Sequence, residues 1–171
     1  GFRVATLDLG DPNRINPNDD TTVPGTTNYN NTGNFGLFVK RNGDVSYLEF
    51  WLGNTPTVSA KLVLWQDNAE LNVGYNVVVR GDEFDFNEST FNNSSLGDTW
   101  PQLGTLAVSG VEPVQAFYEL DITDWYNDNL GKRMSIFLRN DGTWNEYQSP
   151  MFEDREGTRT GDPETYGPRI V

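Results

Sequence analysis

The chain has 171 residues, 36% of them hydrophobic, and its 5 Trp, 7 Tyr and 10 Phe residues offer enough apolar surface for one core, so we expect a single domain over residues 1–171. Its 25 acidic and 12 basic residues give a net charge of −13, which disfavours nucleic acid and anionic membranes as partners. The absence of Cys excludes disulfides and thiolate chemistry, and the absence of His excludes catalytic triads and imidazole metal ligands.

The first predicted element is a long loop over Asp11–Gly36, which is rich in Asn, Asp, Thr, Pro and Gly and poor in aliphatic residues. Loops of this length in a compact domain are commonly functional or held by a metal ion. Oxygen-bearing side chains are the hard ligands that Ca²⁺ prefers, although the spacing here is not that of an EF-hand. Candidate ligands of a structural Ca²⁺ are Asp8, Asp11, Asn13, Asp19 and Asp20.

Six later segments alternate apolar and polar residues, which predicts strands. In chain order they are Tyr47–Leu52, Ala60–Trp65, Tyr75–Arg80, Phe117–Ile122, Met134–Arg139 and Pro150–Phe152. Turn-forming clusters such as Asn42-Gly43-Asp44 and Asn140-Asp141-Gly142 separate them, and a short helical turn is expected within Asp121–Asn129. The pattern predicts an all-β fold, an antiparallel β-sandwich of jelly-roll type.

The period of two assigns the two faces of these strands. The residues expected in the core are Leu48, Phe50, Leu52, Ala60, Leu62, Leu64, Tyr118, Leu120, Ile122, Met134, Ile136 and Leu138. The opposite face carries Tyr47, Glu49, Trp51, Lys61, Val63, Trp65, Phe117, Glu119, Asp121, Ser135, Phe137 and Arg139. Such a mixture of aromatic and charged residues is typical either of a sheet surface covered by loops or of a ligand platform.

Several short motifs follow one another along most of the chain. They are Thr27-Asn28-Tyr29, Ser46-Tyr47-Leu48-Glu49-Phe50, Ala60-Lys61-Leu62-Val63-Leu64, Glu88-Ser89-Thr90-Phe91-Asn92-Asn93, Leu120-Asp121-Ile122-Thr123, Phe152-Glu153-Asp154-Arg155-Glu156 and the closing Pro168-Arg169-Ile170-Val171. In this order they resemble the DNRLRE-domain family. The resemblance implies a jelly-roll sandwich of secreted multidomain proteins, whose characterised members are carbohydrate-binding modules, notably for alginate. Glu49, Trp51 and Asn30 depart from the family's pattern, which affects the expected ligand more than the expected fold.

Sugar rings bind to exposed aromatic faces, with polar side chains at their edges to contact the hydroxyl groups. Trp144 and Tyr147 lie in a polar stretch and are the first candidates for such a platform. Trp51 and Trp65 are the second pair, because they point outward from strands that we expect to be neighbours. Trp100 is a further candidate, although the family's pattern implies that it is buried, and Trp125 is expected to cap the core from a short helical turn.

An acidic glycan such as alginate also needs cations to pair with its carboxylates. The candidates are Lys40, Arg41, Lys61 and Arg139. We expect Arg155 to be structural, paired with Glu156 or with a carboxylate on a strand.

These features together predict a carbohydrate-binding module that does no chemistry, a monomeric part of a larger secreted or cell-surface protein, with a polysaccharide as its partner. Residues 1–8 have no signal-peptide pattern and no apolar run is long enough to cross a bilayer, so we expect a mature or excised domain. The acidic composition also fits a marine bacterium. Two alternatives remain open, a structural or adhesive sandwich of a cell-surface protein and a small polysaccharide lyase or hydrolase that uses paired carboxylates or Tyr and Arg.

Overall fold

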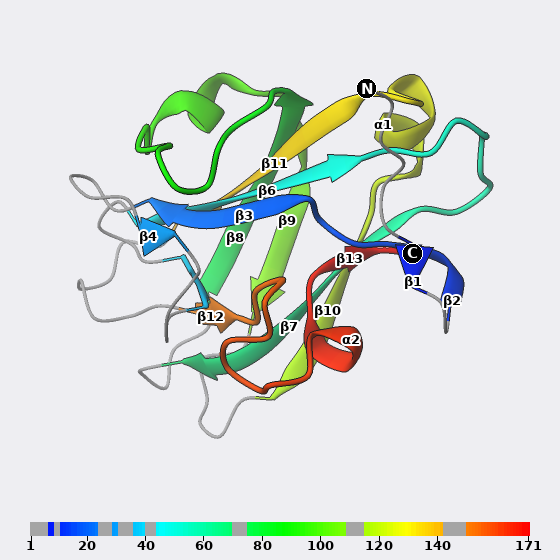
Figure 1. The fold of residues 1–171 in the computed structure, drawn as a ribbon. Coiled ribbons are helices and arrows are strands. Elements are labelled where there is room, and N and C mark those ends of the chain that lie inside the picture. The colour runs from blue at the N-terminus through cyan, green and yellow to red at the C-terminus, as the bar shows by residue number, and fades with distance from the viewer. Residues whose placement is uncertain are drawn as a thin grey trace.

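A computed structural model describes residues 7–8, 11–23, 29–30, 36–39, 44–69, 75–108, 115–141 and 150–171 (Figure 1). These residues form two antiparallel sheets packed face to face, so the all-β sandwich predicted from the sequence is confirmed. No helix among them is long and apolar enough to cross a membrane.

The first sheet is built around the nine-residue strand β7. Its strands are β1 (Leu7–Asp8), β2 (Asp11–Ile15), β13 (Arg169–Ile170), β7 (Lys61–Ala69), β12 (Pro150–Phe152) and β5 (Leu37–Phe38), with β10 (Ala116–Asp121) paired to the other edge of β7. Strands β13 and β12 pair with successive parts of one edge of β7, while β10 pairs with residues 61–66 along the opposite edge. The C-terminal strands β12 and β13 therefore lie beside β7, which comes from the middle of the sequence.

The second sheet has six strands. Their order is β4 (Tyr29–Asn30), β3 (Asp19–Val23), β6 (Val45–Trp51), β11 (Arg133–Asn140), β8 (Tyr75–Glu83) and β9 (Gln102–Val108). Each pair in it is antiparallel, and β11 is hydrogen-bonded on both sides along nearly its full length.

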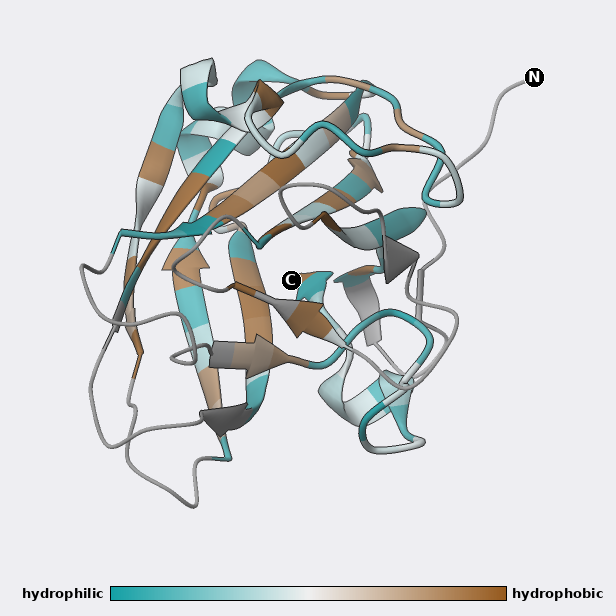
Figure 2. Cartoon of the chain, turned by 90° about the vertical axis from the view of Figure 1, so that its left-hand side faces the viewer, coloured by the Kyte–Doolittle hydropathy of each residue, from teal (hydrophilic) through white to brown (hydrophobic). Residues whose placement is uncertain are grey.

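The core lies between the sheets, and the strand faces that point into it are those predicted by the period of two. All twelve residues expected to face inward belong to this core, with Tyr118 and Leu120 partly buried at its margin. The hydropathy colours alternate along several strands, as this arrangement requires (Figure 2).

A second, aromatic core covers the outer face of the second sheet. The segment 84–100, which ends in the short 3₁₀ helix η1 (Leu96–Thr99), packs Phe86 and Trp100 against Tyr47 and Phe137. The outward-pointing rings of Tyr47 and Phe137 are therefore buried beneath a loop and do not form an open platform.

Two short helices complete the described fold. Helix α1 (Thr123–Asp128) follows β10, as expected, and places Trp125 partly buried against the main core. Helix α2 (Pro163–Tyr166) was not predicted from the sequence.

Two expectations need correction. The segment Asp11–Gly36, predicted as a long loop, contains β2, β3 and β4, because β-branched residues such as Thr21 and Thr22 pair with β6 and are buried there. Trp51 and Trp65 were expected on neighbouring strands but lie in different sheets, on β6 and β7. The two indoles therefore cannot form one surface.

Candidate functional site

The outer face of the first sheet carries a group of rings that we call the aromatic patch, made up of Trp65, Phe117 and Tyr166. Trp65 on β7 and Phe117 on β10 are directly opposite in the register of the two strands. Tyr166, the last residue of α2, packs on both. Its ring centroid lies 4.5 Å from that of Trp65, and 6.1 Å from that of Phe117 at an interplanar angle of only 13°.

The three rings differ in burial, since Trp65 is buried and the other two are at least partly exposed to solvent. Trp65 is 6% exposed beneath the patch, whereas Phe117 is 45% exposed and Tyr166 is partly exposed. Val58 and Phe117 are the exposed large hydrophobic residues of the described chain. The near-parallel Phe117 and Tyr166 rings thus offer apolar surface to solvent, which is what a sugar ring needs.

Helix α2 is held in place by polar contacts at its start and along its backbone. The Asp162 side chain accepts a hydrogen bond from Thr165 N at 3.1 Å, and Pro163 occupies the first turn, both common features of a helix start. Arg14 of β2, which is 6% exposed, donates to the Pro163 carbonyl at 2.9 Å and to the Glu164 carbonyl. The position of Tyr166 is therefore fixed by a strand that is distant in sequence.

Charged side chains surround the aromatic patch. The Arg169 guanidinium lies 5.0 Å from the centre of the Phe117 ring and donates to the Thr165 and Gly167 carbonyls. Lys61 Nζ lies 3.4 Å from Glu119 Oε2, and both side chains are about half exposed. The patch thus combines apolar rings with groups able to bind hydroxyl or carboxylate groups.

Three carboxylates form a separate feature, the acidic cluster, which consists of Asp20, Glu88 and Glu156. One oxygen from each lies within 4.8 Å of the other two. Asp20 comes from β3, Glu88 from the segment after β8, and Glu156 from the segment after β12. Three parts of the chain that are far apart in sequence therefore meet here, and carboxylate oxygens at this spacing could hold a metal ion.

Arg155 partly compensates the charge of the acidic cluster. Its Nη2 lies 2.8 Å from Glu88 Oε1, and its Nε lies 3.2 Å from Glu156 Oε1 and 3.7 Å from Asp20 Oδ1. The prediction that Arg155 pairs with Glu156 and a strand carboxylate is confirmed. One guanidinium still faces three carboxylates, so the cluster keeps an excess of negative charge.

Burial makes this excess charge unfavourable. The Asp20 side chain is fully buried, and burial followed by repulsion from Glu156 holds its pKa well above the usual range. Burial also raises the pKa of Glu156 to about 7, although the charge of Arg155 lowers it. Both carboxylate oxygens of Glu156 are buried and accept no hydrogen bond from the described residues. A proton or a metal cation would relieve the repulsion.

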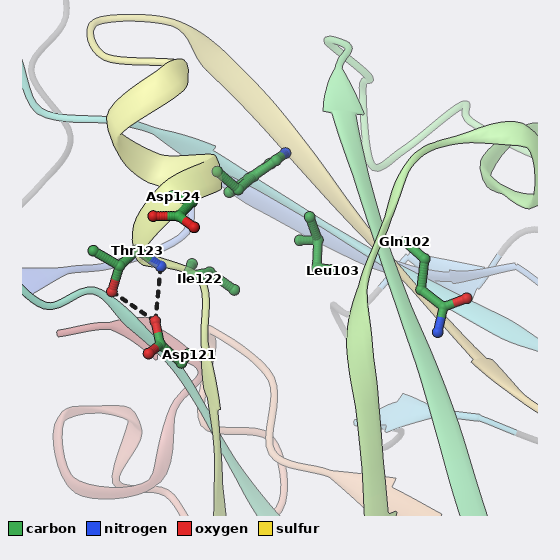
Figure 3. Close-up of a pocket in the computed structure, with 7 residues that line it drawn as sticks. Gln102, Leu103, Asp121, Ile122, Thr123 and Asp124 are labelled. Atoms are coloured by element: carbon green, nitrogen blue, oxygen red, sulfur yellow. Dashed lines mark hydrogen bonds between the residues drawn. The ribbon is translucent and has the colours of Figure 1, made fainter.

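A polar pocket of about 450 Å³ opens where β9, β10 and α1 meet (Figure 3). Leu103 of β9 points across it toward α1, and Asp121 and Asp124 lie on the opposite side, whereas the Gln102 side chain points away from them. Asp121 Oδ1 accepts hydrogen bonds from Thr123 N at 2.9 Å and Thr123 Oγ1 at 2.6 Å, which hold the pKa of Asp121 below its usual value.

The predicted sugar-binding residues have separate places in the structure. Trp65 and Lys61 lie on the face that carries the aromatic patch, which leaves Trp65 as its buried base. Trp51 lies beneath the Arg133 guanidinium, 4.7 Å from it, on the other sheet. Arg139 forms two hydrogen bonds with Asp98, at 2.7 and 3.1 Å, and so anchors η1.

The other predicted residues are described less fully. Trp144, Tyr147, Lys40 and Arg41 lie outside the described residues. Asp8, Asp11 and Asn13 lie in β1 and β2, but their side chains are outside the description. Asp20 belongs to the acidic cluster, and Asp19 lies at its edge, 3.9 Å from Arg155 Nη2.

Sequence reasoning missed Tyr166, Glu88 and Glu156 as site residues. The Asp162-Pro163 pair, a common start of a helix, was the available signal for α2 and hence for Tyr166. No sequence signal brings Glu88 and Glu156 to Asp20, since that proximity depends on the packing of three segments. No family model matches the chain, and no curated protein matches its sequence.

Proposed function

We propose that the chain is a non-catalytic carbohydrate-binding module that attaches a secreted parent protein to a polysaccharide. The observation that carries this proposal is the aromatic patch, where the 45%-exposed ring of Phe117 stands beside the near-parallel ring of Tyr166. Two such rings bind the C–H face of a pyranose by apolar contact, and the surrounding Lys61, Glu119 and Arg169 contact its polar groups. Trp65 packs against the Tyr166 ring and is opposite Phe117 in the register of β7 and β10.

The resemblance to the DNRLRE-domain family favours alginate as the glycan, and a red-algal galactan is the alternative. Arg169 lies beside the exposed ring of Phe117, and Lys61 lies farther along the same face, where it pairs with Glu119. An acidic glycan would pair with them, whereas a neutral glycan would depend mainly on Phe117 and Tyr166.

We also propose that the acidic cluster binds a Ca²⁺ ion and that the role of this ion is structural. Asp20, Glu88 and Glu156 are hard oxygen ligands, which suits Ca²⁺ better than a softer metal. The oxygens of Glu156 support this assignment, because they are buried and accept no hydrogen bond from the described residues, although Arg155 Nε lies 3.2 Å from Oε1. The ion would tie β3 to two later segments.

Binding is tested by calorimetry and affinity gels with alginate, agar, porphyran, carrageenan and cellulose. We expect Phe117→Ala to weaken binding of the recognised glycan by about 1 kcal/mol, roughly fivefold, with an almost unchanged melting temperature. Val58→Ala is the matched control, because Val58 is a fully exposed hydrophobic residue away from the patch. Trp144→Ala and Tyr147→Ala in the same panel compare the loop predicted from the sequence.

Three outcomes would contradict the proposal. Full affinity in Phe117→Ala and Tyr166→Ala would remove the aromatic patch as the contact surface. No binding to any glycan in the panel would favour a structural or adhesive sandwich. Reducing ends or unsaturated products that accumulate with the purified protein would favour a hydrolase or a lyase.

A further inference from the structure

From the pocket between β9, β10 and α1 we infer a second carbohydrate contact, a subsite for a neutral sugar ring. This inference rests on the proposed function and decides between its two glycans, because a subsite for a neutral sugar favours a neutral red-algal galactan over alginate. None of the residues that line this pocket belongs to the aromatic patch, although Asp121 lies on the same strand, β10, as Phe117.

The pocket has the size and the surface of a sugar site. Its volume is about 450 Å³, which is within the range of small-molecule pockets. Leu103 and the partly exposed indole of Trp125 supply apolar lining, while Asp121 and Asp124 supply carboxylates. A pyranose has one apolar C–H face and a rim of hydroxyl groups, so it matches a site with both kinds of surface.

The polar groups in the pocket are mainly acceptors. Asp121 uses one oxygen to accept from Thr123, and its other oxygen has no hydrogen-bond partner within the described part of the chain. The exposed Asp124 side chain also makes no hydrogen bond or ion pair with those residues. Sugar hydroxyls are donors, and hydrogen bonds from them to carboxylates are stronger than those to neutral acceptors.

The charge of the pocket selects against acidic sugars. The described residues that line it include no Lys or Arg, and two of them are carboxylates. Lys61 is opposite Asp121 in the register of β7 and β10, but it is paired with Glu119 and does not line the pocket. A uronate or a sulfated sugar would therefore place its anion beside Asp121 and Asp124 with no unpaired cation among the residues that line the pocket, which is unfavourable. The pocket therefore fits a neutral hexose or pentose unit and not a unit of alginate.

Both contacts can serve one extended glycan. Phe117 and Asp121 lie four residues apart on the same face of β10, a separation of about 13 Å at the usual rise of a strand. A chain of several sugar units lying along β10 would reach both. It would then bind more tightly than a single sugar ring, because the second contact forms within one complex.

The test uses the full chain labelled with ¹⁵N and follows the indole N–H resonance of Trp125 by NMR, assigned with Trp125→Phe. The probes are agaro-, cello-, manno- and xylo-oligosaccharides, with alginate oligosaccharides and CaCl₂ alone as comparisons. We expect at least one neutral oligosaccharide to shift this resonance. Asp124→Asn should weaken that binding roughly fivefold to tenfold.

Asp128→Asn is the matched control, since Asp128 is an exposed carboxylate on the same helix that does not line the pocket. The inference is overturned if neutral oligosaccharides bind but Asp124→Asn has full affinity and Trp125 is unaffected, and the proposed function then stands on Phe117. It is also overturned if alginate oligosaccharides bind in the pocket as tightly as neutral ones, or if only CaCl₂ shifts Trp125. Absence of binding by every glycan removes both the inference and the proposed function.

Discussion

Glu49 is a buried carboxyl group at the centre of β6, with a side chain only 1% exposed. It accepts a hydrogen bond from Phe86 N at 3.1 Å and lies 3.3 Å from Arg133 Nε. Burial, followed by the neighbouring Asp85, raises the pKa of Glu49 to about 8, and this outweighs the attraction of Arg133. The folded protein therefore holds a proton on Glu49 at neutral pH.

This proton makes the stability of the fold depend on pH. In the unfolded chain Glu49 titrates near pH 4.5, so its contribution to stability is complete below that pH and is lost as the pH rises to about 8. We expect Glu49→Gln, which keeps an acceptor for Phe86 N, to lose less stability than the wild-type protein between pH 5 and pH 8. Urea denaturation at several pH values, with excess Ca²⁺ throughout, measures the difference. Parallel pH profiles would show that Glu49 is already ionised in the folded protein.

At the scale of elements, one hydroxyl group makes two of the hydrogen bonds that attach the segment 84–100 to the second sheet. Tyr47 OH accepts a hydrogen bond from Gly97 N at 3.0 Å and donates one to the Asn93 carbonyl at 2.9 Å. Gly97 is required at this contact, because a Cβ atom there would lie 2.3 Å from the buried Phe137 ring. Tyr47 thus fixes η1 against β6 and β11.

Removing that hydroxyl should loosen the segment and leave the Gly97 N–H buried without an acceptor. We expect Tyr47→Phe to lower the free energy of unfolding by about 1–3 kcal/mol. Hydrogen exchange at Gly97 should accelerate more than exchange in β11. Tyr166→Phe is the control, since the Tyr166 hydroxyl makes no hydrogen bond with the described residues. Equal stability of the two variants would mean that the Tyr47 hydroxyl contributes nothing and that the aromatic packing and the other polar contacts hold the segment.

The same segment shows what the sequence could and could not predict. Strict alternation in β6, β7, β10 and β11 predicted which residues form the main core, because a strand's period is set by local geometry. The period cannot say what covers the opposite face. Tyr47 and Phe137 are buried by a segment without periodicity, whereas Phe117, which has the same phase, is exposed.

The candidate site was predictable only in part, for a related reason. The outward direction of Phe117, Trp65 and Lys61 follows from strand phase, and Asp20 follows from the oxygen-rich composition of its segment. Tyr166 reaches the patch through the four-residue helix α2, which is too short to have a hydrophobic period. Glu88 reaches Asp20 through tertiary packing, which no local pattern encodes.

At the scale of the whole molecule, the acidic cluster is a point where distant parts of the chain are joined. Asp20 lies in the N-terminal part of the second sheet, Glu88 in the segment over its outer face, and Glu156 between β12 and β13 of the first sheet. Without a cation, burial raises the pKa of both Asp20 and Glu156, and repulsion adds to this effect, from Glu156 on Asp20 and from Glu88 on Glu156. An ion there would therefore stabilise both sheets together and not one loop.

Calcium should accordingly raise the melting temperature of the entire domain. An ion that binds only the folded state adds about 2.7 kcal/mol when its concentration is 100 times Kd, which corresponds to roughly 5–10 °C for a chain of this size. Calorimetry with Ca²⁺ and with excess chelator measures the shift. Glu88→Gln and Glu156→Gln should each reduce it, whereas Glu83→Gln, an exposed carboxylate of β8, should leave it unchanged. An identical melting curve in chelator, with no metal detected in the purified protein, would mean that only protons and Arg155 compensate the negative charge of the acidic cluster.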